Sequence, residues 1–321
     1  MFNTALFFTT LINVIILLIY IVPGFCLAKA RILRTDHLPA FSAVLVYLCA
    51  PCLVMSAFFS LRYDGVEARS MLLFFFVALA LQALFIGVLY LILRRRYGDA
   101  RYRILTISAV LGNTGFFGLP VITSLFGAEH PVVACYSVVF TVSMNILVYT
   151  MGIFCLTNDR KYMSLKPAVM NPTSVGVVVG VAVYLLSPVV SLTGVAAEAA
   201  ARFADAVSIV AKMSSPLCMF ILGVRLAQMS LRSLFTRPFI YLTTVLKLLV
   251  FPLFCYLVLY FLPLDPVFKA SILVLASVPN ASIMLSLAEL HHGETELAAN
   301  TLLVTTLLCF LTMPVLASFL I

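Results

Sequence analysis

The chain has 321 residues, of which 64% are apolar and 10% are charged, and its mean hydropathy is +1.17. Soluble domains are about half apolar and about a quarter charged, so this composition excludes a water-soluble enzyme. The net charge of +8 comes from basic residues in short clusters between apolar runs, a pattern typical of membrane-protein loops rather than of a nucleic-acid-binding surface.

Long unbroken apolar runs, rather than short alternating ones, indicate an all-α polytopic membrane protein embedded in a lipid bilayer. A helical span takes about 20 apolar residues, and ten runs qualify. In chain order they are 3–27, 38–61, 70–93, 105–126, 131–156, 172–192, 203–227, 239–262, 270–290 and 297–320. We predict ten transmembrane helices in a single membrane domain, 1–321. The first run lacks a basic leading segment and a clear cleavage site, so we expect it to be a retained helix.

Basic residues in the loops predict the orientation. The loops after spans 1, 3, 5 and 7 hold fourteen Lys and Arg residues, whereas the opposite side holds four. Positively charged loops face the cytoplasm, so we expect both termini to lie outside. The short loops favour a bacterial inner membrane.

The two halves of the chain share features at a nearly constant offset of 165 to 167 residues. The pairs are Pro23 and Pro188, Pro51 and Pro216, and Asn113 and Asn280. Each half has five spans, and an odd number makes the second half enter from the opposite face. We therefore predict an inverted repeat of 1–157 and 171–321, a frequent plan of secondary transporters. Chance placement among the 15 prolines is the alternative.

The fourth and ninth runs carry helix-weakening residues at corresponding depths. Residues 111–121 contain three glycines and a proline, and residues 277–283 contain Pro279 and Asn280. Paired interruptions of this kind point to a transporter's binding site, because each half-helix that starts there directs its positive dipole end inward, where it suits a carboxylate. The alternative is that Pro and Gly only kink the spans.

From these interruptions we predict a substrate site in which amide side chains cap the half-helices or donate to the substrate. The predicted site residues are Gly112, Asn113, Thr114, Gly115, Pro279, Asn280 and Ser282. The predicted helix-break or hinge residues are Pro51, Gly118, Pro120 and Pro216.

The motif GNTGFFGLP (112–120), Asn171–Pro172, and the stretch from SVPNAS to LAELHHG resemble the auxin efflux carrier family. This family includes bacterial organic-acid permeases and plant PIN-FORMED carriers. The resemblance covers all ten spans, and segments around Pro51, LGVRL (222–226) and KLLVFP (247–252) also fit. It implies an elevator-type transporter, similar to bile-acid symporters and sodium–proton antiporters, with broken and crossing spans 4 and 9.

The same resemblance implies a scaffold of spans 1, 2, 6 and 7, a moving transport domain of spans 3–5 and 8–10, and a homodimer through the scaffold. In the plant relatives, the Asn that matches Asn113 contacts the substrate carboxylate. Gly112 stands where the plant motif has Pro, Asn280 stands where it has Gln, and the long central loop is missing. These departures argue against auxin as the substrate.

Two lysines and one polar pair within spans are further candidates. Lys247 could attract an anion, take the place of a coupling cation, or bind backbone carbonyls at the span 9 break. Thr141 and Asn145 share a helix face and could line the pathway or hydrogen-bond between helices. Lys212 is expected to reach the interface along its helix or pair with Asp205.

The sequence shows no pattern for carboxylate-based ion exchange, cofactor binding, metal binding or disulfide formation. Spans 4, 5, 9 and 10 lack a mid-span carboxylate pair, which weakens the antiporter interpretation, and sodium or a proton stays open as a coupling ion. We expect no cofactor, metal site or structural disulfide, and interpret Cys49–Cys52 as apolar packing and His291–His292 as a solvated turn.

The sequence therefore predicts a secondary transporter of small organic anions, mono- or dicarboxylates such as malate, by alternating access. The alternatives are a sodium-coupled symporter of the bile-acid type and a membrane receptor that binds without transport. An enzyme is not expected, because no nucleophile–base or metal constellation is visible.

Overall fold

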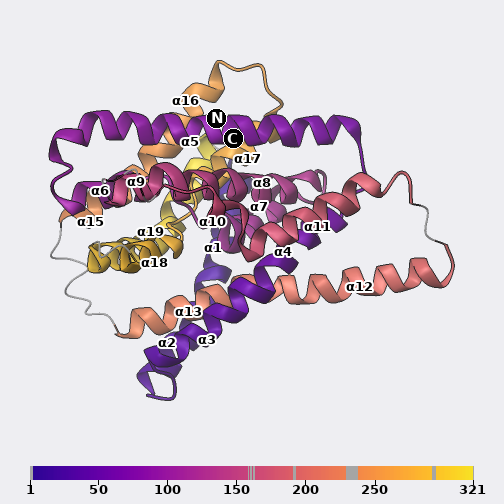
Figure 1. Cartoon of the computed structure of the whole chain (residues 1–321), viewed down its shortest axis with the longest axis horizontal. Helices are drawn as coiled ribbons and strands as arrows, with labels where there is room; N and C mark the ends of the chain where they lie inside the picture. Colours follow the sequence, from indigo (N-terminus) through magenta and orange to yellow (C-terminus); the bar gives the residue numbers. More distant parts are fainter. Residues whose placement is uncertain are drawn as a thin grey trace.

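The computed structural model describes residues 3–157, 159, 161, 163–190, 193–228, 238–290 and 294–320. Within these ranges the chain is helical, and the only β-type pairing is one isolated bridge (Figure 1). The His291–His292 pair lies outside them. The helices are α1 (Thr4–Ile19), α2 (Ile21–Lys29), η1 (Thr35–His37), α3 (Leu38–Ala43), η2 (Val44–Cys49), α4 (Ala50–Phe59), α5 (Gly65–Leu93), η3 (Arg94–Arg96), α6 (Ala100–Ser108), η4 (Thr114–Gly118), α7 (Leu119–Phe126), α8 (Val132–Leu147), η5 (Val148–Gly152), α9 (Ile153–Thr157), α10 (Lys166–Val169), α11 (Pro172–Leu186), α12 (Val195–Lys212), α13 (Ser214–Gln228), α15 (Pro238–Val245), η7 (Leu246–Val250), α16 (Phe251–Tyr260), α17 (Pro266–Ala276), α18 (Ile283–Leu290) and α19 (Thr295–Leu320).

Seven helical segments of the described chain are long and apolar enough to cross a membrane. Three shorter apolar helices, Thr114–Phe126, Pro172–Leu186 and Pro266–Ala276, fall in the predicted spans 4, 6 and 9. The protein is thus an integral, polytopic helical membrane protein, and the count of ten crossings stays a prediction. Large apolar side chains such as Val178 and Leu257 face outward, exposed by 69% and 61%, as a surface in contact with lipid requires.

The boundaries of four predicted spans differ clearly from the helices. The helices of the runs 70–93 and 105–126 begin earlier, at Gly65 and Ala100. The run 172–192 is helical only to Leu186. The helix of the run 203–227 begins earlier, at Val195, because the alanine-rich stretch before Arg202 favours helix without being continuously apolar. Counting apolar residues alone misses such an extension.

Three prolines each follow a π-helical turn. Pro51, Pro120 and Pro252 are the second residues of α4, α7 and α16, which directly continue η2, η4 and η7. A proline lacks the amide hydrogen and clashes with the carbonyl four residues earlier, so a widened turn accommodates it. Pro216 stands near the start of α13, just after the interruption at Met213.

The helices pack in two groups. In one, α2 packs on α13, and α4 packs on α11 and α12. The α2–α13 approach is so close that a Cβ at Gly24 or Gly223 would collide with a backbone carbonyl of the other helix. In the other group, α8 packs on α5 and α17, while α19 packs on α15 and α18. Figure 1 shows α5 and α17 at one side of the molecule and α2, α3 and α13 at the other.

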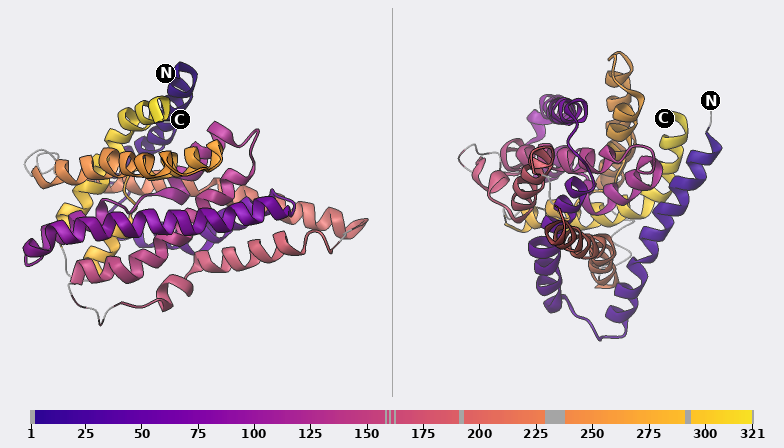
Figure 2. Two further views of the ribbon diagram at one scale, coloured as in Figure 1. Left: turned by 90° about the horizontal axis from the view of Figure 1, so that it is seen from above. Right: turned by 90° about the vertical axis from the view of Figure 1, so that its right-hand side faces the viewer.

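The two ends of the described chain lie side by side. Helices α1 and α19 pack together, and the Asn3 amide donates to the Ser318 carbonyl at 3.1 Å. All views in Figures 1 and 2 show the N- and C-terminal marks close together. The two ends of the described chain therefore lie at the same face of the helical assembly.

Candidate substrate-binding site

Two interrupted helices meet at the centre of the site. One interruption separates α6 from η4, and the other separates α17 from α18. An isolated antiparallel bridge joins Gly112 and Asn280 across the gap. In this bridge the Asn113 amide donates to the Pro279 carbonyl at 2.8 Å, and the Ala281 amide donates to the Leu111 carbonyl at 3.3 Å. Each interrupted segment thus provides hydrogen-bond partners for backbone groups of the other.

Glycine at position 112 permits this close approach. A Cβ there would lie 2.7 Å from Val278 Cγ2 and 3.0 Å from Lys247 Nζ. A side chain at this position would push the two breaks apart, because both neighbours are buried.

A cavity of about 420 Å³ opens beside the paired breaks. It is bounded by η2 and α4, by the segment that begins η4, by α8 and η5, by the start of α11, and by the start of α18. Seven predicted residues line it: Gly112, Asn113, Thr114, Gly115, Thr141, Asn145 and Ser282. Three others, Pro279, Asn280 and Lys247, do not.

The polar character of the cavity comes from helix ends and neutral side chains. η4 and α18 both begin at its surface, at Thr114 and Ile283. The first amides of a helix have no partner within it and carry a partial positive charge. Every lining residue lies in the described ranges, and none is charged. This arrangement suits a small anion that is recognised by dipoles and neutral donors.

Hydroxyl groups hold one wall in place. Thr114 Oγ1 and Thr141 Oγ1 lie 2.6 Å apart, and the Ser137 hydroxyl donates to the Thr114 carbonyl at 2.8 Å. These bonds tie the start of η4 to α8. Thr141, predicted to share a helix face with Asn145, therefore both lines the cavity and holds the start of η4 in place.

Asn113 is the amide side chain at the mouth of the first break. It is 8% exposed and lines the cavity. Its Nδ2 lies 3.6 Å from Cys218 Sγ on α13, and a thiol is a weak acceptor. The Asn113 amide can therefore exchange this contact for a stronger acceptor such as a carboxylate.

Asn280 has a different environment. It is buried, and its Nδ2 donates at 3.0 Å to the carbonyl of Ser108, the last residue of α6. Its backbone amide donates to Thr305 Oγ1 at 3.1 Å. The side chain thus closes the end of α6 instead of lining the cavity, and its predicted contact with substrate stays a prediction.

Lys247 is fully buried between the two breaks. Its Nζ donates to the Ala276 carbonyl at 3.0 Å and to the Val110 carbonyl at 3.3 Å, and it lies 5.1 Å from the Phe251 ring centroid. Both carbonyls stand at the C-terminal ends of half-helices, where the dipole is negative. Of the three roles considered for Lys247, the one seen in this geometry is hydrogen bonding to backbone carbonyls at the breaks.

Sequence reasoning missed five polar residues of the cavity: Tyr47, Tyr149, Asn171, Thr173 and Ser286. Asn171 caps α11, since its Oδ1 accepts from the Ser174 amide at 3.0 Å. The Asn171–Pro172 pair was a visible signal of a helix start, but nothing in the sequence indicated that this start faces the breaks.

Comparison with known proteins identifies the family of the chain, and the matches cover nearly all of it. The model of the family described as "Membrane transport protein" matches residues 9–167 and 160–317. The chain belongs to the auxin efflux carrier-like family. An uncharacterized transporter of Methanocaldococcus jannaschii is 24% identical over 299 residues, which cover 91% of this chain and 93% of that protein. This member of the auxin efflux carrier-like family is thus a membrane transport protein.

Proposed function

We propose that this transporter carries small organic anions, mono- or dicarboxylates such as malate, and binds them at the paired helix breaks. One observation carries the proposal: two half-helices start at the same uncharged cavity, and Asn113 lines it directly before the first of them. Each helix start favours a negative charge by about 0.3–1 kcal/mol, and by up to about 2 kcal/mol where it is partly buried.

In the proposed binding mode, the substrate carboxylate accepts from the Asn113 amide and from the first backbone amides of η4 and α18. Gly112 lets the two breaks approach each other, and Gly115 and Ser282 line the cavity beside the substrate. Asn280 keeps α6 in position, and Pro51, Gly118, Pro120 and Pro216 serve as helix breaks or hinges.

We further propose ten spans in a 5+5 inverted repeat with crossing spans 4 and 9. The adjacent termini support an even number of crossings, because both chain ends reach the same face. Positions related by the repeat offset also touch, as expected near a pseudo-twofold axis. The Ser214 hydroxyl donates to the Cys49 carbonyl at 3.3 Å, 165 residues away.

The packing groups support an elevator mechanism. The group of α2, α4, α11, α12 and α13 belongs to spans 1, 2, 6 and 7, the proposed scaffold, and the cavity lies between this group and the helices of the breaks. Helix α1, the first part of span 1, packs mainly on α19 and α7, which belong to the proposed moving spans. Sliding of spans 3–5 and 8–10 would carry the substrate along the scaffold and break the Asn113–Cys218 contact. We place the protein in a bacterial inner membrane, with both termini outside and a homodimer formed through the scaffold.

Lys247 supports transport without sodium. Its ammonium group already occupies the space between two half-helix carbonyl ends, where a bound cation would otherwise neutralise the dipoles. We propose that uptake is coupled to protons or to the membrane potential, or proceeds as uniport. Strict sodium dependence would instead favour a symporter of the bile-acid type.

The test is uptake of labelled malate into proteoliposomes, with a panel of carboxylates as competitors and with proton, sodium and voltage gradients imposed separately. We expect saturable uptake that competitors inhibit and that Asn113→Ala abolishes. Asn3→Ala, which removes an exposed helix cap far from the cavity, is the matched control. Binding without flux in sealed vesicles would indicate a receptor, and normal uptake by Asn113→Ala would refute the site.

A further inference from the structure

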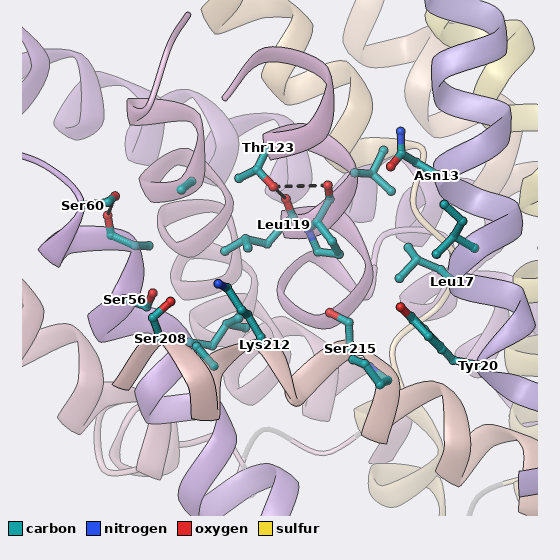
Figure 3. A pocket seen from close by; sticks show the side chains of 18 residues that line it. Asn13, Leu17, Tyr20, Ser56, Ser60, Leu119, Thr123, Ser208, Lys212 and Ser215 are labelled. Carbon is teal, nitrogen blue, oxygen red and sulfur yellow. Dashed lines mark hydrogen bonds between the residues drawn. The ribbon is translucent and has the colours of Figure 1, made fainter. Parts of the chain in front are cut away.

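A second cavity, also of about 420 Å³, lies between α1, α4, α7, α12 and α13 (Figure 3). Unlike the first cavity, it has a charged residue in its wall. Lys212 is the one charged side chain among its lining residues, all of which are described, and none of them is acidic. In Figure 3 the Lys212 side chain extends from its helix into the cavity.

The donors of this cavity are available to a ligand. Within the described ranges, Lys212 forms no ion pair, and the expected pairing with Asp205 is not present. The hydroxyls of Ser56, Ser208 and Ser215 also line the cavity and have no hydrogen-bond partner among the described residues. One ammonium group with several free hydroxyls is a donor set for a small anion.

The two cavities are separated by the same side chains. Leu53 and Leu119 line both of them, so these two leucines stand between the two spaces. An apolar barrier of this kind opposes passage of an anion, because a charge loses its hydration there.

The cavities also lie toward opposite ends of α11. The first includes Asn171 at the start of that helix, and the second includes Ser60, next to the end of α4. The far end of α11 is close to that point, since the Tyr184 hydroxyl donates to the Asp64 carbonyl at 3.0 Å. A helix of 15 residues spans roughly 22 Å, and the two cavities extend from the barrier toward opposite ends of this helix.

We propose that the second cavity is a separate binding site for small carboxylates, in which Lys212 supplies the positive charge and the free hydroxyls supply further hydrogen bonds. The choice of carboxylates as the ligand class rests on the proposed function. The site concentrates anions on the side of the Leu53–Leu119 barrier opposite to the first cavity, as a charged vestibule does for a charged substrate. The uncharged first cavity then takes over the ligand when the barrier moves.

The experiment measures anion preference without requiring transport. Ser208 is one helical turn from Lys212 and lines the same cavity. Ser208→Cys is labelled with methanethiosulfonate reagents that carry either a sulfonate or a trimethylammonium group, and mass spectrometry of the peptide separates this cysteine from the natural ones. The rate ratio of the two reagents is divided by the ratio at Thr193→Cys, an exposed position just before α12 that does not line the cavity.

We expect the normalised ratio to favour the anionic reagent. The ratio is expected to fall about tenfold when Lys212→Gln is added, because a unit positive charge about 6 Å away in water attracts the anionic reagent and repels the cationic one. Acetate, malate or citrate at millimolar concentration is expected to slow labelling at position 208 and not at position 193. A ratio equal to that of the control, no change with Lys212→Gln, or no protection by any of the three acids would overturn the proposal. Absence of uptake for every carboxylate of the panel, with the charge preference and the protection at position 208 intact, would instead refute the proposed function.

Discussion

Gly112→Ala is expected to destabilise the protein, because it forces apart the two helix breaks that form the candidate site. The added Cβ would lie 2.7 Å from Val278 Cγ2 and 3.0 Å from Lys247 Nζ, whereas comfortable contacts between carbon atoms are about 3.5–4.0 Å. Overpacking of this kind costs about 1–3 kcal/mol. If the bridge opens, two backbone hydrogen bonds of about 0.5–1.5 kcal/mol each are lost as well, for a total of up to about 6 kcal/mol.

The assay is thermal unfolding of the purified protein in detergent, together with malate uptake by proteoliposomes. Gly87→Ala is the matched control, since nothing lies within 4 Å of a Cβ at that position of α5. Alanine is favoured over glycine in a helix by up to about 1 kcal/mol, so the control is expected to keep or slightly raise the melting temperature. A Gly112→Ala protein as stable and active as the control would refute the packing of the breaks.

Three further substitutions test individual contacts. Lys247→Met is expected to lower the melting temperature and abolish malate uptake, because two buried carbonyls lose charged hydrogen bonds of about 1.5–3 kcal/mol each; unchanged uptake and stability would contradict the role given to Lys247. Asn280→Ala leaves the Ser108 carbonyl unpaired at a cost of about 1–3 kcal/mol. We expect it to reduce the maximal rate more than the apparent affinity for malate, and the opposite pattern would indicate direct contact with substrate. Thr141→Val keeps the side-chain shape but removes the 2.6 Å contact with Thr114, and a few-fold rise in the KM of uptake is expected, whereas an unchanged KM would place Thr141 outside the binding surface.

Local chemistry made the positions of the breaks predictable. Gly112 and Pro279 lie in the interruptions that follow α6 and α17. Gly115, Gly118 and Pro120 instead lie within the helix formed by η4 and α7. The apolar runs likewise predicted a polytopic helical membrane protein. Both predictions depend only on residues that are close in the sequence.

Contacts between distant segments were not predictable in the same way. Asn280 shares its residue type with Asn113, but the end of α6 takes its amide. Lys212 was expected to reach the interface along its own helix or to pair with Asp205, and its cavity exists only because α1, α4 and α7 meet there. The role of Lys247 depended on the positions of Val110 and Ala276, which the sequence alone left open.

The central claim is that a carboxylate binds at the paired helix breaks, and a structure with a marked ligand tests it most directly. The measurement is an anomalous difference map from crystals of the protein grown with bromosuccinate, a dicarboxylate that carries a strong scatterer. The account predicts a bromine peak in the first cavity, beside Asn113 and the starts of η4 and α18, that is lost in Asn113→Ala crystals. A ligand bound elsewhere with this cavity empty, or a peak that persists unchanged in Asn113→Ala, would contradict it.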